Sequence, residues 1–174
     1  MDVVRKQIQK LRGSVELHSV EGKGAAFSLR LPLTLAIIDG LVVTSGSERY
    51  IIPLASVKEL FRPTPGQVST IEGRAEVVSV RDQLIPVLRL YSRFGIVPKT
   101  SDPMASVFVM AETDDATFCI MVDDLVGKQE VVIKSLGTVF RNIPGVAGGA
   151  ILGDGRVGLI LDLQTLFAGN SDVH

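Results

Sequence analysis

The chain has 174 residues, of which 46% are hydrophobic, and its 18 basic and 19 acidic residues give a net charge of −1. This balance, without a basic stripe interleaved with aromatic residues, argues against a nucleic-acid-binding protein. The longest apolar run is shorter than the roughly 18 residues that a membrane-spanning helix needs, so direct membrane insertion is not expected. Met1 is followed by Asp2 rather than by a basic and then apolar leader, which predicts a cytoplasmic location.

The first predicted elements are a short helix and a β-hairpin. Residues 2–11 place apolar side chains at helical spacing, and Gly13 follows them as a helix stop signal. Residues 14–20 and 27–31 alternate apolar and polar positions on either side of a turn, which predicts two antiparallel strands. About thirty residues cannot bury enough apolar area to offset their ordering entropy. We therefore expect residues 1–33 to be the end of a larger domain.

A domain boundary is predicted at the sequence Leu-Pro-Leu-Thr, residues 31–34. Pro32 removes a backbone donor and so interrupts strand pairing. Residues 33–43 are then apolar at nearly every position, as in a strand that is covered on both faces. We expect a second domain over residues 34–168, followed by a tail at residues 169–174.

The second domain is predicted to be mainly β, because many short strands are separated by turn signals. Two segments, residues 75–94 and 148–167, resemble each other as hairpins that run into a short helix. The only clear linker composition, PKTSDP at residues 98–103, divides the region into halves of similar length. We therefore predict two packed five-stranded β-barrels, over residues 34–97 and 104–168. The predicted strands are residues 35–45, 49–55, 74–80, 83–88, 106–112, 117–122, 130–133, 147–152 and 156–161.

A glycine loop near the N-terminus is the first candidate for chemistry. Gly22 and Gly24 flank Lys23, and such glycines let backbone amides approach a phosphate, but a simple hairpin turn is the stronger interpretation. His18 lies in an alternating strand, where an exposed structural histidine is expected. His174 is the last residue, so the two histidines are not expected to form a metal site or proton relay.

The other reactive side chains also favour structural roles. Cys119 is the only cysteine, so the chain has no internal disulfide, and its apolar neighbours predict a buried thiol. The pairs Asp114-Asp115 and Asp123-Asp124 lack the spacing of a calcium loop and are interpreted as turn and strand-end residues. No serine or cysteine is paired with a histidine in a nucleophilic pattern. We therefore expect neither a catalytic site nor a metal site in this chain.

The remaining candidate is a surface for protein partners. Leu35, Ile37 and Leu41 share one face of the first strand of the second domain, and the interior of a small barrel takes only one face. The other face is covered either by the second barrel or hairpin, which is the favoured interpretation, or by a partner. Arg81, together with Arg89 and Arg93, is expected to be an exposed charge that either steers association or is simply solvated.

The junction at residues 31–38, LPLTLAII, resembles that of the chemotaxis histidine kinases of the CheA family, where the ATP-binding domain leads into a CheW-like regulatory domain. Further motifs occur in the same order over essentially the whole chain. They are MDVVRKQIQKLRGSVEL, which resembles the helix and strand after the nucleotide-lid glycines, EGKGAAF at 21–27, which resembles the final glycine box, VDDLVGKQEVVIKSLG at 122–137 and GGAILGDGRVGLILDL at 148–163.

This resemblance implies an architecture and a role. Residues 1–33 would be the remnant of an α/β ATP-binding domain, and residues 34–168 would form two SH3-like barrels that bind the CheW adaptor and chemoreceptor tips. The parent protein would be an ATP- and magnesium-dependent histidine kinase, whereas this part would have no cofactor. Ala25 replaces the threonine usual in the family, and the magnesium and adenine motifs are missing, so Gly22 and Gly24 would be vestigial.

Two alternative functions remain open. The chain is a free-standing CheW-like adaptor, or it retains nucleotide binding through its glycine loop, although the missing motifs argue against this. Independently of these, the open strand edges of the truncated hairpin predict a homodimer through residues 14–31.

Overall fold

The computed structural model describes residues 14–20, 24–30, 36–73, 75–134 and 143–168. The chain divides into two compact units, Met1–Ala36 and Ile37–His174. In the first unit, β1 (Ser14–Val20) and β2 (Gly24–Arg30) form an antiparallel hairpin, as the alternating pattern predicts. The predicted helix at residues 2–11 lies outside the described residues, as does the tail.

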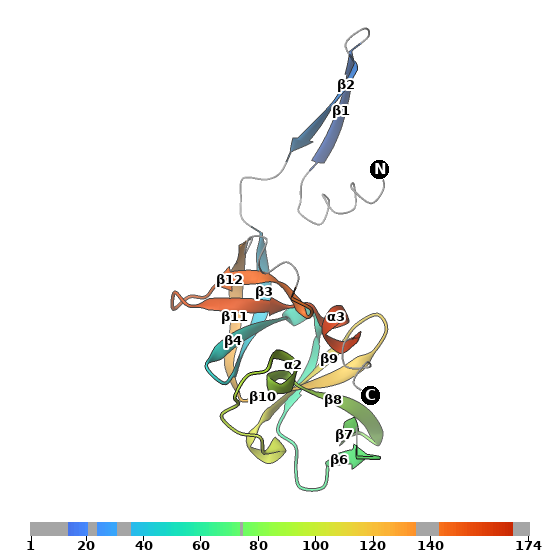
Figure 1. Cartoon of the computed structure of the whole chain (residues 1–174), viewed down its shortest axis with the longest axis vertical. Coiled ribbons are helices and arrows are strands. Elements are labelled where there is room, and N and C mark those ends of the chain that lie inside the picture. Colours follow the sequence, from blue (N-terminus) through green and yellow to red (C-terminus); the bar gives the residue numbers. More distant parts are fainter. Residues whose placement is uncertain (1–13, 21–23, 31–35, 74, 135–142, 169–174) are drawn as a thin grey trace. The chain divides into compact units, whose positions relative to one another are not determined.

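Five strands of the second unit close into a barrel in the order β11-β12-β13-β4-β3 (Figure 1). Neighbouring strands are antiparallel, except that β13 and β4 are parallel. The longest ladder joins β3 to β11 and contains a bulge between Leu125 and Gly127. The bounds are β3 (Ile37–Ser45), β4 (Glu48–Pro53), β11 (Asp124–Lys134), β12 (Val146–Ile151) and β13 (Val157–Leu161).

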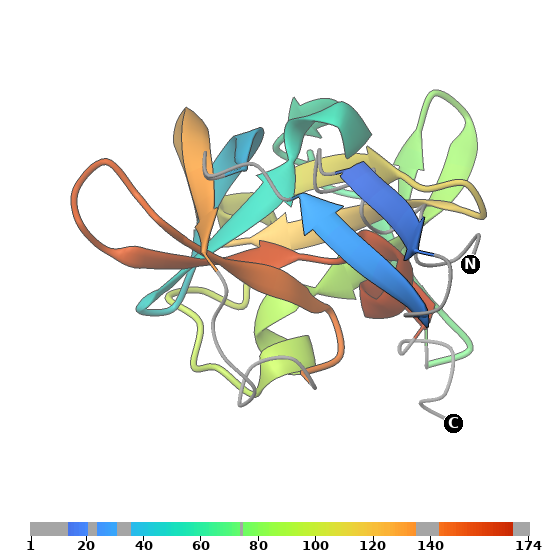
Figure 2. The same ribbon diagram turned by 90° about the horizontal axis from the view of Figure 1, so that it is seen from above.

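The second unit also contains a six-stranded sheet in the order β5-β9-β10-β8-β7-β6 (Figures 1 and 2). Its β10 and β8 are parallel, and the other neighbours are antiparallel. The bounds are β5 (Val57–Phe61), β6 (Val68–Ile71), β7 (Ala75–Val80), β8 (Gln83–Arg89), β9 (Val107–Glu112) and β10 (Thr117–Val122).

The mainly β fold is confirmed, but the strands are distributed differently from the prediction. The linker at residues 98–103 does not separate two barrels, because the closed barrel takes two strands from residues 37–53 and three from residues 124–161. The intervening strands form the other sheet, which has six strands rather than five. The physical reason is the long pairing of β3 with β11, which joins distant parts of the chain.

The two predicted hairpin-and-helix segments are confirmed. The β7–β8 hairpin leads into α2 (Leu90–Phe94), and the β12–β13 hairpin leads into α3 (Leu163–Ala168). In each segment the second hairpin strand also pairs in parallel with a strand from elsewhere in the sequence. Two short 3₁₀ helices complete the described elements, η1 (Leu54–Ser56) and η2 (Pro103–Ala105).

Within the described part of the chain, buried apolar side chains form three clusters. One fills the barrel and includes Val42, Ile51 and Ile160. A second lies on the six-stranded sheet and includes Phe108 and Met121. The largest cluster contains residues of both sheets and of α3, so it is the core that holds the two sheets together. Its buried members are Leu41, Val43, Tyr50, Ile52, Leu88, Leu90, Val107, Val109, Ala111, Phe118, Ile120, Val122, Leu161, Leu163 and Leu166.

A hydrogen-bonded junction at Asp123 ties three segments of the second unit. The Oδ2 atom of Asp123 accepts hydrogen bonds from the backbone amides of Gly46, at 2.6 Å, and Lys99, at 2.9 Å. The amide of Asp123 donates to the carbonyl of Thr44, at 2.9 Å. Gly46 has φ +62°, and an added Cβ would lie 2.5 Å from the carbonyl oxygen of Val97. The junction therefore fixes the β3–β4 turn against the loop that follows α2.

No helix in the described part of the chain is long and apolar enough to cross a membrane.

Candidate interaction surface

A row of aliphatic residues crosses four strands of the barrel. Ile37 of β3 lies opposite Val132 of β11, Val132 lies opposite Ile151 of β12, and Ile151 lies opposite Val157 of β13. Residues directly opposite in antiparallel pairs lie on the same face of the sheet. We call these four residues the aliphatic row.

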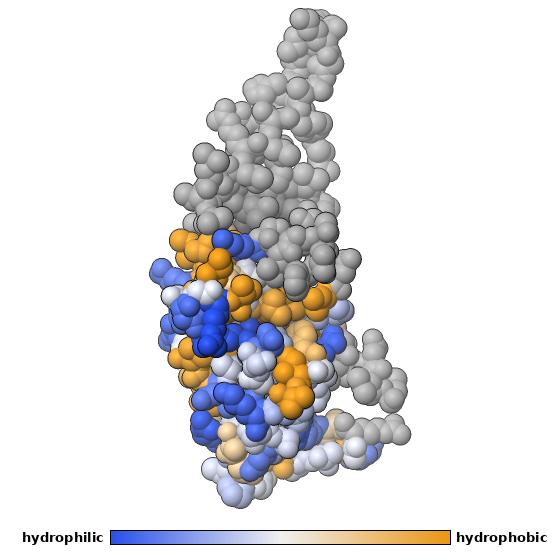
Figure 3. Space-filling view, turned by 60° about the vertical axis from the view of Figure 1, so that its left-hand side comes forward, coloured by the Kyte–Doolittle hydropathy of each residue, from blue (hydrophilic) through white to orange (hydrophobic). Residues whose placement is uncertain are grey.

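The aliphatic row lies on the outer face of the barrel. Its sequence neighbours Ile38, Val131 and Ala150 belong to the cluster inside the barrel, so the alternate residues point outward. The exposed fractions of Ile37, Ile151 and Val157 are 55%, 43% and 58%, and Val132 is half-buried. Figure 3 shows hydrophobic side chains gathered on one face of the second unit, next to hydrophilic ones. Such a contiguous patch is typical of a protein-binding surface.

An acidic pair borders the aliphatic row. Asp39 of β3 lies directly opposite Glu130 of β11, one position along the same outer face from Ile37 and Val132. Both side chains are exposed. Within the described residues, neither carboxylate forms an ion pair, although other acids do, such as Glu76 with Arg89 at 2.6 Å. The row therefore has a negatively charged edge.

The structure gives different positions to Ile37 and Leu41, two residues that the sequence suggested for partner binding. Ile37 belongs to the aliphatic row, whereas Leu41 is 1% exposed and is buried in the core between the two sheets, so its side chain is not available to a partner. This corrects its assignment to the surface and agrees with the interpretation that the second sheet covers this face. Leu35 lies outside the described residues.

Arg81 and Arg89 lie on the six-stranded sheet, whereas Arg93 lies in α2 and is half-buried rather than exposed. Arg81 is 78% exposed at the β7–β8 turn and pairs with Glu59, at 2.9 Å. Arg89 is not a free surface charge, because its guanidinium binds both carboxylate oxygens of Glu76 and also donates to Tyr91 and to the carbonyl of Ser101. The hydrogen bond to Glu76 raises the pKa of Arg89 above its usual value, despite the opposing effect of burial.

Three members of the aliphatic row were missed by sequence reasoning. Val132, Ile151 and Val157 each lie in a run of residues without polar side chains, so the sequence does not distinguish them from the inward-facing residues beside them. Nothing in the sequence places them side by side, because the row depends on the register between β11, β12 and β13.

Those candidates for chemistry that the structure describes do not converge on a reactive centre. Gly22 lies outside the described residues, and Gly24 begins β2 opposite Val20. His18 lies within β1 opposite Ala26. Among the residues that the structure describes, no three histidine, cysteine or acidic side chains gather as a metal site.

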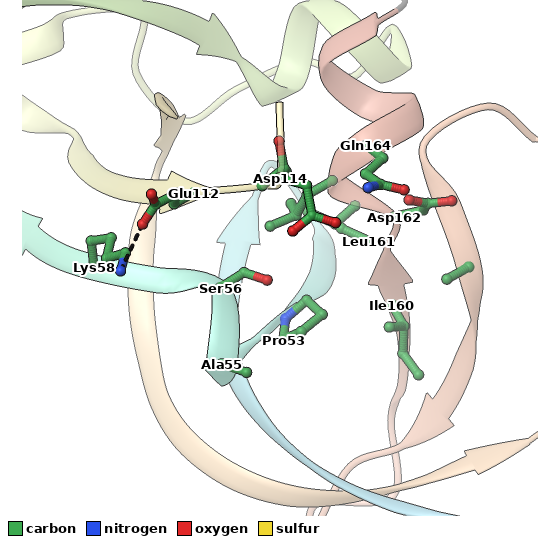
Figure 4. Close-up of a pocket in the computed structure, with 13 residues that line it drawn as sticks. Pro53, Ala55, Ser56, Lys58, Glu112, Asp114, Ile160, Leu161, Asp162 and Gln164 are labelled. Atoms are coloured by element: carbon green, nitrogen blue, oxygen red, sulfur yellow. Dashed lines mark ion pairs between the residues drawn. The ribbon is translucent and has the colours of Figure 1, made fainter. Parts of the chain in front are cut away.

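An open pocket of about 710 Å³ lies between the two sheets. Figure 4 shows Ser56, Asp114 and Asp162 at this pocket, with the Lys58–Glu112 ion pair at its side. None of the described residues that line it is a histidine. The pocket therefore offers hydrogen-bonding groups to a ligand or partner.

Cys119 is fully buried on β10, as the sequence predicts. Burial raises the pKa of its thiol to about 12, with a smaller contribution from Glu59. Since the thiolate is the reactive form, we expect Cys119 to resist a thiol reagent such as dithionitrobenzoate at pH 8 in the folded protein and to react completely in guanidinium chloride. Rapid labelling of the folded protein would contradict this burial.

Comparison with known proteins identifies the second unit. A family model for the CheW-like domain matches residues 39–170. The chain belongs to the CheW-like domain family. The solved structure of scaffolding protein TtCheW from Thermoanaerobacter tengcongensis resembles this CheW-like chain with a TM-score of 0.61. That match covers 76% of this chain and 93% of TtCheW at 22% sequence identity, so it supports the fold.

The CheW-like chain also matches the C-terminal region of CheA proteins. It is 36% identical to chemotaxis protein CheA of Klebsiella aerogenes, over 95% of the chain and 26% of that protein. It is 41% identical to CheA of Treponema pallidum and 40% identical to sensor histidine kinase CheAY of Helicobacter pylori, in both cases over 95% of the chain and 20% of the relative. The chain thus spans about a quarter or less of the length of these relatives.

Proposed function

We propose that this chain is the C-terminal part of a CheA-type chemotaxis histidine kinase and that its CheW-like domain couples chemoreceptors to the kinase. In this role the domain binds the CheW adaptor and contacts the cytoplasmic tips of the receptors, and it works at receptor arrays on the cytoplasmic side of the membrane. Phosphoryl transfer, with ATP and magnesium, belongs to other parts of the parent protein.

The aliphatic row is the observation that carries this proposal. Ile37, Ile151 and Val157 expose large aliphatic side chains on adjoining strands, which is costly unless a partner covers them. The surface is rigid, because each residue is held in a ladder of the closed barrel. A second β-domain with a similar apolar flank can therefore dock without a large loss of conformational entropy.

Origin from CheA has more support than a free-standing adaptor. The alignment with CheA of Klebsiella aerogenes leaves only 5% of the chain outside, so it must include most of the first 36 residues. The CheW-like domain model, in contrast, begins at residue 39. Nucleotide binding has less support, since its only candidates in the sequence are Gly22 and Gly24 and the magnesium and adenine motifs are missing.

A calorimetric titration of the full chain with the CheW adaptor of the same organism tests the proposal. We expect saturable binding, and we expect Ile151→Ser and Val157→Ser each to weaken it about tenfold by removing apolar contact area. The melting temperature should stay unchanged, because both side chains are already exposed. Val97→Ser is the matched control, since Val97 is 84% exposed outside the row.

Two results would count against the proposal. If the unaltered chain does not bind the CheW adaptor at tens of micromolar, the proposed partner is wrong. If the row variants and the Val97→Ser control bind the CheW adaptor with equal affinity, the aliphatic row is not the contact surface.

A homodimer is a second proposal, which rests on the hairpin alone. The first unit shows only β1 and β2 in its described sheet, and an isolated pair of strands is marginally stable. Pairing of a free edge with the same hairpin of another chain would extend the sheet. Light scattering should then give twice the chain mass, and deletion of residues 1–33 should restore the monomer mass. A monomeric full chain would contradict it.

A further inference from the structure

The acidic edge of the aliphatic row has an unusual arrangement for a cross-strand pair. Asp39 and Glu130 occupy directly opposed positions of the β3–β11 ladder and lie on the same face. Like charges in directly opposed positions destabilise a strand pair. This pair is therefore not explained by the stability of the barrel.

The chain does not neutralise this edge with its own described cations. Four other acidic residues of the second unit form close ion pairs with arginine or lysine, namely Glu59, Glu76, Glu112 and Asp154. Lys128 lies two residues before Glu130 on β11, and Lys134 lies four residues after it, yet neither forms an ion pair with Glu130 or Asp39 among the described residues.

The position of the pair connects it to the proposed contact surface. On the outer face of the barrel, the neighbour of Asp39 along β3 is Ile37. The neighbour of Glu130 along β11 on the same face is Val132. Interfaces commonly have an apolar centre and a polar rim, and charges on the rim are matched by opposite charges of the partner. The aliphatic row and the acidic pair have this arrangement.

We infer that the partner of the aliphatic row is a folded protein domain that presents aliphatic side chains together with an arginine or lysine placed between Asp39 and Glu130. Arginine fits best, because its planar guanidinium carries five donors and can bind two carboxylates at once. The inference rests on the proposed function, since it specifies the chemistry of the partner at the same surface. It assigns the acidic pair to partner choice and association rate rather than to folding.

Charge-neutralising variants of the full chain test the inference. We expect Asp39→Asn with Glu130→Gln to weaken binding of the CheW adaptor about tenfold at low salt, and we expect the difference to shrink at 0.5 M NaCl as the charges are screened. The melting temperature of the unbound variant should be unchanged or higher, because the repulsion across the ladder is removed. A purely structural role would lower it.

Controls separate this inference from the proposed function. Asp115→Asn removes an exposed carboxylate from the β9–β10 turn of the other sheet and should leave affinity unchanged. If the unaltered chain binds and the row variants weaken binding while the Asp39/Glu130 variants do not, the inference is overturned and the proposed function stands. If the unaltered chain does not bind, both are overturned.

A charge reversal identifies the partner's cation. Glu130→Lys should weaken binding more than Glu130→Gln, because it adds repulsion. Arginine-to-glutamate and lysine-to-glutamate substitutions on the adaptor should include one that restores binding to Glu130→Lys. Failure of every such substitution to restore binding would contradict a direct contact between the acidic pair and a partner cation.

Discussion

Replacing Leu41 with alanine is expected to lower the free energy of unfolding by about 2–5 kcal/mol, the usual cost of removing a buried leucine side chain. Leu41 is 1% exposed in the core between the two sheets, so the cavity would lie where the barrel meets the six-stranded sheet. Chemical denaturation followed by circular dichroism measures the change.

Ile37→Ala is the matched control for Leu41→Ala, because both residues belong to the outer face of β3. Ile37 is 55% exposed, so its truncation should change the free energy of unfolding by no more than about 0.5 kcal/mol. The two variants should therefore separate folding from binding, with Leu41→Ala affecting stability and Ile37→Ala affecting affinity. Equal stabilities of the two variants would show that the sheets do not pack through Leu41.

Replacing Asp123 with alanine is expected to lower the free energy of unfolding by about 3 kcal/mol, because a carboxylate with two amide donors is lost. The amides of Gly46 and Lys99 would lose their acceptor in a part-buried place. Asp123→Asn keeps an acceptor oxygen and should cost about half as much. Thermal or chemical unfolding of the three proteins measures the order.

The adjacent residue provides the control for the Asp123 variants. Asp124 is exposed, and its carboxylate lies 3.7 Å from Arg62 and accepts a solvent-exposed hydrogen bond from the amide of Leu125, at 2.9 Å, so Asp124→Ala should change stability by only about 0.5 kcal/mol. A loss of stability from Asp124→Ala equal to that from Asp123→Ala would mean that general charge effects, rather than the two hydrogen bonds, stabilise this region.

Local patterns in the sequence predicted most of the strands. The alternation in β3 correctly separated Ile38 and Val42, which are inside the barrel, from Leu41 outside it. The hairpins that lead into α2 and α3 were also predicted, because their turns and helices depend on neighbouring residues. By contrast, β5 and β6 were missed, since only part of each is buried and their hydrophobic signal is weak.

Pairing between distant strands could not be predicted from the same patterns. A linker-like composition at residues 98–103 suggested two sequential barrels, but hydrogen bonding joins β3 to β11 and β4 to β13 across the six-stranded sheet. The same limit applied to the candidate surface. The position of Ile37 within its strand was enough to suggest it as a partner-binding residue. The residues beside it in the aliphatic row depend on how β11, β12 and β13 are aligned with one another, which the sequence does not show.

In the sequence, the strands of the six-stranded sheet lie between the first two and the last three strands of the barrel, and this order has a consequence for synthesis of the protein. All strands of the six-stranded sheet emerge from the ribosome before β11, whereas the barrel cannot close until β13 has been made. During that interval, β3 and β4 can pair with each other, but Val42 and Ile51 lack the side chains of β11, β12 and β13 that cover them in the closed barrel. Apolar surface that stays uncovered during synthesis is prone to aggregate, so this domain is most vulnerable, and most in need of a chaperone, until β13 has been translated.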